Sequence, residues 1–156
     1  MIIKPAVYLG IGEEMGTFTQ KELEYLKEQA LAGTRGYLAT VSRKQSPQLT
    51  PVGFVADEER IYLNIQHDSV KARNIRRNPR VSFVVDDFIP PMREAIIRGV
   101  SVRGEAELIS SGKHHKVGRG LFYEWFPWWG DKYPIQEGGL GNILVITPTK
   151  IRSWGL

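Results

Sequence analysis

The chain has 156 residues, of which 42% are hydrophobic and 24% are charged, as in an ordinary globular domain with one core. It contains no cysteine, which excludes disulfides and thiolate metal sites, and its net charge of +4 weakly favours anionic ligands. The first residues lack the apolar core of a signal peptide and no apolar run reaches membrane-spanning length, so we expect a cytoplasmic protein outside the membrane.

The first half of the chain predicts a leader, a helix and a hairpin. Residues 1–16 contain three glycines and predict an irregular leader. A capping-box pattern at Thr19–Glu22 starts an apolar helical repeat that ends at Gly33, which predicts a surface helix. Residues 36–42 and 48–56 predict two strands joined by a polar turn, and so a β-hairpin.

Pro51 lies inside the second strand of this hairpin. Because proline cannot donate to a strand ladder, its position indicates an edge strand, a bulge or an opening in the sheet. Gly53 nearby allows close backbone approach. A flat ligand would fit at such an interruption, whereas a simple edge strand without a ligand fits the pattern equally well, so both alternatives stay open.

The rest of the chain predicts further strands joined by short connections. In chain order these elements are strands at 61–65, 81–85, 96–109 and 143–147, with a helix at 69–77. Residues 86–91 predict a loop, and residues 148–156 predict a tail. Six strands with few helices favour a mainly β barrel or meander over a parallel α/β sheet. We expect a single domain over residues 1–156, with residues 111–141 as an inserted loop region rich in glycine and aromatic residues.

The helix at 69–77 carries the strongest chemical signal. A helix start attracts anions, Ser69 offers a hydroxyl and a cap, and Lys71 offers a mobile charge, with Arg73 as a further candidate. These residues predict a phosphate site, while Ala72 and Ile75 predict the face toward the core. Because residues 69–80 contain five cations and no acid, a nucleic-acid patch and a plain solvated basic face remain alternatives.

Histidine and aromatic residues carry weaker signals. His67, His114 and His115 have no further metal ligand at convincing spacing, and no nucleophile–base constellation is visible, so we expect neither a zinc site nor a side-chain catalytic centre. Residues 122–129 are the most aromatic segment, which predicts a lid over a ring-shaped substrate, packing for the inserted loop or a subunit contact. Packing or a subunit contact is favoured, since aromatic enrichment at interfaces is the broader pattern.

Several segments, taken in order, carry a resemblance to a known family. They are Gly36–Val41, Thr50–Gly53, Ser69–Ala72, Asn78–Phe83 and Arg98–Glu107. Together they resemble the pyridoxamine 5′-phosphate oxidase superfamily, the flavin-binding split barrels. The ending Arg152-Ser153-Trp154-Gly155 is similar to that of the branch that depends on a deazaflavin, coenzyme F-420.

The resemblance implies a six-stranded antiparallel split β-barrel of Greek-key type, with flanking helices, that forms a homodimer with cofactor sites at the subunit interface. The cofactor contacts that it implies fall into three groups. They are Ser69, Lys71, Arg73 and Asn74 at the phosphate; Thr50, Pro51, Val52, Asn64 and Ile65 along the tricyclic ring; and Arg152 and Trp154 from the partner chain. Backbone N–H groups at a bulge around Pro51 would stabilise negative charge on the reduced ring.

The resemblance also implies the class of activity. It implies an oxidoreductase that transfers a hydride between FMN or coenzyme F-420 and a small planar substrate, with no obligatory side-chain acid or base. The arginine that true pyridoxamine phosphate oxidases carry before Ile61 and their C-terminal substrate-binding segment are absent, which argues against vitamin B6 oxidation. A non-catalytic flavin carrier is the alternative. A nucleic-acid-binding module is less favoured, because Asn78-Pro79 and the flanking strands fit the barrel better.

Overall fold

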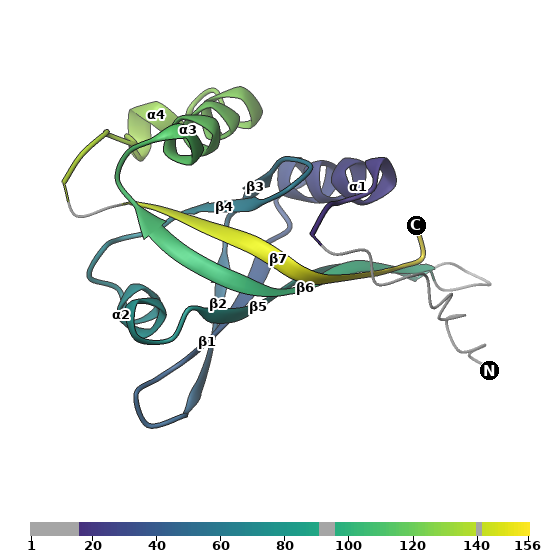
Figure 1. The fold of residues 1–156 in the computed structure, drawn as a ribbon. Coiled ribbons are helices and arrows are strands. Elements are labelled where there is room, and N and C mark those ends of the chain that lie inside the picture. Colours follow the sequence, from purple (N-terminus) through teal and green to yellow (C-terminus); the bar gives the residue numbers. More distant parts are fainter. Residues whose placement is uncertain (1–15, 91–95, 140–141) are drawn as a thin grey trace.

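One antiparallel sheet of seven strands dominates the computed structural model, which describes residues 16–90, 96–139 and 142–156 (Figure 1). The strands are β1 (Gly36–Val41), β2 (Pro47–Val52), β3 (Val55–Ala56), β4 (Ile61–Asn64), β5 (Arg80–Ile89), β6 (Ile96–Ile109) and β7 (Ile143–Trp154). The helices are α1 (Gln20–Leu31), α2 (Val70–Arg77), α3 (Lys113–Trp125) and α4 (Trp129–Lys132). The strand order across the sheet is β2-β1-β5-β6-β7-β4-β3.

The two edge strands of this sheet are neighbours in the sequence. β2 and β3 lie at opposite ends of the strand order, yet only Gly53 and Phe54 separate them in the chain. Three Cα–Cα steps span at most roughly 11 Å. The sheet therefore has to curl until its two edges meet at this join, although the hydrogen-bonded ladder itself stays open.

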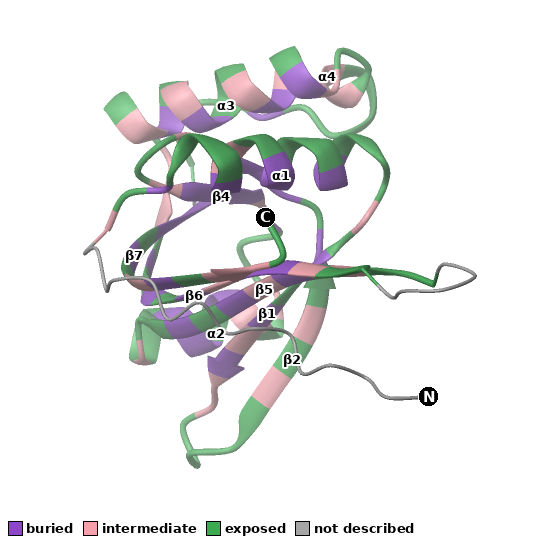
Figure 2. Cartoon of the chain, turned by 90° about the vertical axis from the view of Figure 1, so that its right-hand side faces the viewer, coloured by how far each residue is buried: buried purple, intermediate pink, exposed green. Residues whose placement is uncertain are grey.

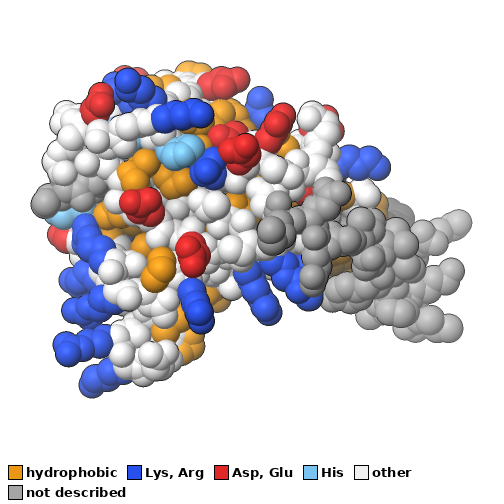
Figure 3. Space-filling view, in the orientation of Figure 1, with side chains coloured by type: hydrophobic (Ala, Val, Ile, Leu, Met, Phe, Trp, Pro, Cys, Tyr) orange, Lys and Arg blue, Asp and Glu red, His pale blue; other side chains and the backbone are white. Residues whose placement is uncertain are grey.

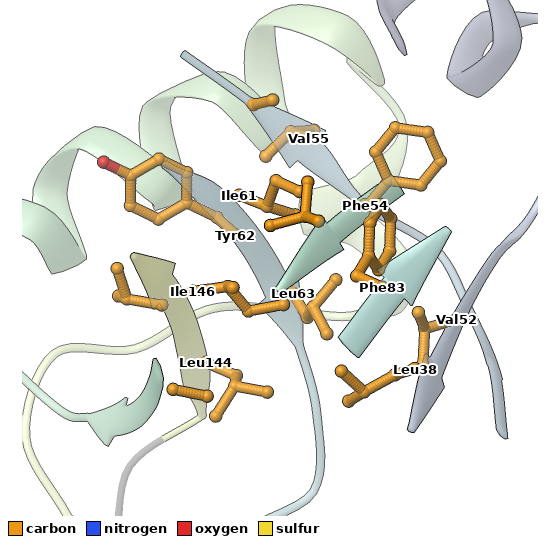
Figure 4. Close-up of a cluster of buried hydrophobic side chains, with 14 of the residues drawn as sticks. Leu38, Val52, Phe54, Val55, Ile61, Tyr62, Leu63, Phe83, Leu144 and Ile146 are labelled. Atoms are coloured by element: carbon orange, nitrogen blue, oxygen red, sulfur yellow. The ribbon is translucent and has the colours of Figure 1, made fainter. Parts of the chain in front are cut away.

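The inner face of the curled sheet holds the core. Leu38, Phe83 and Val102 form one row across β1, β5 and β6, and none of them is more than 1% exposed. Phe54, at the join of β2 and β3, packs edge-on against Phe83 with their ring centroids 5.3 Å apart (Figure 4). The place where the edges meet is thus filled by aromatic side chains.

The helices cover the ends of the curled sheet. The predicted capping box of α1 is confirmed, because Thr19 Oγ1 accepts from the Glu22 N–H at 3.2 Å and Glu22 Oε2 accepts from the Thr19 N–H at 2.9 Å. α2 packs against β1 and β6 through Ala72 and Ile75, as its spacing predicts. α1 and α3 lie on the side of the sheet opposite to α2, and their buried faces point toward the sheet (Figure 2).

The structure corrects three sequence-based boundaries. The predicted loop at 86–91 is strand as far as Ile89, because β5 stays paired with β6 up to the pair Ile89–Ile96. The predicted tail at 148–156 is strand as far as Trp154, since a register shift between Arg103 and Gly104 lets β7 continue past its proline. The predicted second strand divides into β2 and β3 at Gly53, which makes seven strands rather than six.

The expectation of an inserted loop at 111–141 was also wrong for much of its length. α3 and α4 occupy part of this region, and α3 buries His115, Gly118, Phe122 and Trp125 at helical spacing. Gly118 is a packing position, because a Cβ there would lie 2.7 Å from the Tyr62 ring. At least this glycine therefore allows close contact with the sheet and does not mark a loop. Residues 1–15 of the predicted leader lie outside the described residues.

A polar contact ties α1 to the hairpin of β5 and β6. The Asp87 carboxylate accepts from the Tyr25 hydroxyl at 2.8 Å and from Arg98 Nε and Nη2 at 3.2 and 2.9 Å. The Arg98 guanidinium holds the pKa of Asp87 below its ordinary value, against the opposing effect of burial. Burial, together with the bond to Asp87, raises the pKa of Tyr25.

We expect Asp87→Asn to lower the free energy of unfolding by about 1–2 kcal/mol at pH 7. Because folding lowers the pKa of Asp87, this stabilisation is present above the ordinary carboxylate pKa of about 4 and is lost as the pH falls below it. Urea unfolding of both proteins at pH 7 and at pH 3 measures the difference, which should shrink at the lower pH. An equal difference at both values would show that the charge of Asp87 contributes nothing.

Candidate cofactor-binding site

The start of α2 is held by Ser69. Its Oγ accepts from the Ala72 N–H at 3.3 Å and donates to the Gln66 carbonyl at 2.8 Å. The preceding loop is fixed from the other side, because Arg76 Nη1 donates to the His67 carbonyl at 2.7 Å. Ser69 therefore caps the helix as predicted, and its hydroxyl hydrogen is engaged within the loop.

Lys71 places a positive charge at this helix start, and the nearest acidic residue in the sequence, Asp68, forms no ion pair with it. Its side chain is half-buried and makes no ion pair or hydrogen bond with the residues that the structure describes. The backbone N–H groups of Val70 and Lys71 likewise have no partner among those residues. The first turn of α2 contains no acidic residue. An ammonium group and two free N–H groups at the positive end of a helix form a site suited to an anion.

Asn74 connects α2 to the first hairpin. Its Nδ2 donates to Thr40 Oγ1 at 3.0 Å and to Gln48 Oε1 at 3.4 Å, and the residue is only 5% exposed. The amide N–H groups thus point into the core and hold the helix beside β2. Lys71 lies roughly 5 Å from Asn74 along α2, and Thr50 lies roughly 7 Å from Gln48 along β2. The Asn74–Gln48 contact therefore brings Lys71, predicted to bind the cofactor phosphate, near Thr50, predicted to lie along the cofactor ring.

Pro51 lies in a regular edge strand. β2 pairs with β1 alone, and the register runs without a shift from Gly36–Val52 to Val41–Pro47. The edge interpretation is confirmed, whereas the bulge whose N–H groups were expected to face the cofactor is absent from β2. Pro51 is exposed and Val52 is buried, so the outward side of this edge is open to a ligand.

Asn64 ends β4, and Ile65 follows it, beside the aromatic segment at 122–129. In the amide orientation that satisfies both of its polar atoms, Asn64 Nδ2 donates to the Asn142 carbonyl at 3.0 Å and Oδ1 accepts from Trp129 Nε1 at 2.9 Å. The Ile65 N–H also donates to the Asn142 carbonyl, at 3.0 Å. The Trp129 ring reaches the join of β2 and β3, where its Cη2 would lie 3.6 Å from a Cβ on Gly53. The sequence singled out the aromatic segment that contains Trp129 but could not indicate these contacts, because they join three distant segments.

Arg152 and Trp154 lie far from α2 within one chain. Trp154 pairs with Gly99 of β6, whereas the strand that follows α2 begins at Arg80, opposite Glu105. Gly99 and Glu105 are six residue steps apart on β6, or roughly 20 Å, and Arg152 pairs with Ser101, four steps or roughly 13 Å from Glu105. Figure 1 likewise shows the C-terminus and α2 at opposite ends of the sheet. A contact of these two side chains with the cofactor of a partner chain stays a prediction.

A family profile described as pyridoxamine 5′-phosphate oxidase matches residues 20–155. The chain belongs to this family. The match includes every residue that we predict to contact a cofactor, together with the region of α3 and α4.

One relative and two solved structures add detail. A 5a,11a-dehydrotetracycline/5a,11a-dehydrooxytetracycline reductase of Streptomyces rimosus subsp. rimosus is 40% identical over 99 residues, which cover 61% of this chain and 66% of that protein. The match thus spans just under two thirds of the relative's length. The heme storage protein HutZ of Vibrio cholerae is 18% identical with a TM-score of 0.67, covering 88% of this chain and 95% of that one. A FAD-binding protein of Mesorhizobium loti is 21% identical with a TM-score of 0.61, covering 92% and 97%.

The surroundings of the site in this family member are basic and open. Figure 3 shows Lys and Arg side chains gathered along the edge of the molecule where Figure 1 places α2, and Arg73 and Arg77 are among its exposed residues. Two hollows of about 510 and 640 Å³ lie elsewhere, and no predicted cofactor contact lines either of them. Among the described residues, no three acidic or histidine side chains form a metal site, and no helix is long and apolar enough to cross a membrane.

Proposed function

We propose that the chain is an oxidoreductase that uses FMN or coenzyme F-420 to transfer a hydride to or from a small planar organic substrate. The observation that carries this proposal is the Lys71 ammonium beside two free N–H groups at the start of α2, which fits a phosphate group. Membership of the pyridoxamine 5′-phosphate oxidase family and the Streptomyces reductase support the oxidoreductase class.

The residues of the chain would bind and orient the cofactor. Lys71 neutralises the phosphate, and Ser69 fixes the helix start that presents the N–H groups. The edge of β2 from Thr50 to Val52 lies along the ring, next to the end of β4 at Asn64. The cofactor, when bound, supplies the hydride chemistry, and the protein supplies orientation and the exclusion of water.

We propose that the outer face of β2, β1 and β5 is the subunit interface of a homodimer. Leu49 and Tyr37 are 67% and 43% exposed on this face, and Pro51 and Val84 lie beside them. The same row of the sheet continues to Arg152 of β7. A continuous, partly apolar sheet face of this kind is suited to pairing with a second copy. Such a dimer would bring the last residues of β7 toward the partner's cofactor.

Absorbance and fluorescence titration of the purified protein with each cofactor tests the proposal. We expect saturable binding of one of the two at micromolar protein concentration. A yellow protein with quenched flavin emission would identify FMN, and tight binding of the deazaflavin alone would identify coenzyme F-420. Binding of neither would overturn the proposed function.

A carrier without turnover is the second candidate, because it shares every binding feature of the site. The fold also occurs in HutZ, a heme storage protein. A reduction assay of the bound cofactor with candidate electron donors separates the two functions. Cofactor binding without any reduction or reoxidation by organic substrates would favour the carrier.

A further inference from the structure

Three aromatic side chains at α4 form a tilted cluster, in which the ring of Trp129 makes angles of 39° with Trp128 and 46° with Tyr133. Trp129 lies between Trp128 and Tyr133, with ring-centroid distances of 5.4 and 5.0 Å. Trp129 is half-buried, whereas Trp128 and Tyr133 are 49% and 52% exposed. We call these three residues the aromatic shelf. Its inner ring is held by the protein, and its two outer rings face the surface.

The aromatic shelf is anchored on the two elements that carry the proposed ring site. In the amide orientation of Asn64 that satisfies both of its polar atoms, the Trp129 indole N–H donates to Asn64 Oδ1 at 2.9 Å, at the end of β4. Its ring also contacts the position of Gly53, which directly follows the β2 edge from Thr50 to Val52. Because both anchors adjoin residues assigned to the cofactor ring, the shelf borders the place where a substrate would meet that ring.

Packing accounts for Trp129 but not for its two neighbours. Trp129 also contacts the rings of Phe122 and Phe126, so it continues the core of α3. Trp128 meets Phe126 edge-on with 5.9 Å between ring centroids, and Lys132 Nζ lies 6.0 Å from the Trp128 centroid. About half of Trp128 and of Tyr133 nevertheless remains exposed, and the Tyr133 hydroxyl has no partner among the described residues. Exposed aromatic faces beside a binding site favour stacking with a flat ligand, which offers geometry as well as apolar area.

We propose that the aromatic shelf binds the planar ring system of the substrate and thereby selects substrates with fused rings. This inference rests on the proposed function, because the substrate has to lie beside a bound cofactor ring. The related Streptomyces reductase is named for tetracycline compounds, which contain four fused rings, and this agrees with a broad flat ligand.

Calorimetric titration of the cofactor-loaded protein with tetracycline tests the proposal. We expect Tyr133→Ala and Trp128→Ala each to weaken tetracycline binding by roughly 3- to 10-fold, because each removes one aromatic contact. Tyr133→Phe keeps the ring and should bind like the unmodified protein. Phe88→Ala removes a 58% exposed aromatic side chain from β5 and should leave tetracycline affinity unchanged. The affinity of each variant for the cofactor is measured separately and should stay the same.

The outcomes separate the shelf from the proposed function. Normal cofactor binding with no tetracycline binding, or with equal tetracycline affinity in all variants, would overturn the shelf and leave the oxidoreductase proposal standing. Failure of the unmodified protein to bind either cofactor would overturn both. A change of oligomeric state by light scattering in Trp128→Ala or Tyr133→Ala, without a change of tetracycline affinity, would identify the surface as a subunit contact and also overturn the shelf.

Discussion

Replacing Lys71 with alanine should weaken binding of the proposed cofactor by roughly 10- to 100-fold. A charge-assisted hydrogen bond to a phosphate contributes about 1.5–3 kcal/mol, and each 1.4 kcal/mol corresponds to about tenfold in affinity. Stability should not change, because the Lys71 side chain binds no other described residue. Fluorescence titration with FMN and with coenzyme F-420 measures the affinity, and urea unfolding verifies that the variant is folded.

Arg77→Ala is the matched control for this change. It removes the same unit charge from the same helix, but from the last turn, where Arg77 is exposed. We expect at most about a twofold loss of cofactor affinity, because exposed charges more than about 10 Å apart are largely screened at physiological salt. Similar losses in the two variants would show that the cofactor responds to net charge alone. Unchanged affinity in Lys71→Ala would place the phosphate elsewhere.

The sequence predicted α2 well because its determinants are local. Ser69 caps the helix, Ala72 and Ile75 recur on one face, and the residue before Pro79 disfavours helix, so four neighbouring positions define the element. The same applies to the capping box of α1 and to the turn between β1 and β2. The helix start that carries the proposed phosphate site could therefore be predicted before the fold was known.

The rest of the site depends on contacts between distant segments. Nothing near Asn74 in the sequence indicates that its amide donates to Thr40 and Gln48, and its predicted contact with the cofactor stays a prediction. The glycines of α3 suggested a loop. Gly118 is required by the Tyr62 ring, which lies 56 positions earlier in the chain, so the neighbouring residues do not indicate this contact. Packing of this kind is fixed by tertiary contacts, and local propensity does not report it.

Phe83→Ala should lower the free energy of unfolding by about 3–5 kcal/mol, because it removes a buried aromatic ring and leaves a cavity. Phe83 is 1% exposed and packs against Phe54, which fills the join where β2 and β3 meet. That join also carries Gly53 beside the proposed ring site. We therefore expect weaker cofactor binding together with the lost stability. Urea unfolding, followed by cofactor titration under folding conditions, measures both effects.

Gly36 provides an independent test of this packing. A Cβ at Gly36 would collide with the Phe83 ring, so Gly36→Ala alone should cost about 1–3 kcal/mol through overpacking. In the Phe83→Ala background the added methyl group enters the cavity, and its cost should fall, which gives a favourable coupling energy in a double-mutant cycle. Phe88→Ala, at an exposed position, should change stability by no more than about 0.5 kcal/mol. An equal cost of Gly36→Ala in both backgrounds would show that the ring does not occupy the space above this glycine, and the account of the β2–β3 join would then be wrong.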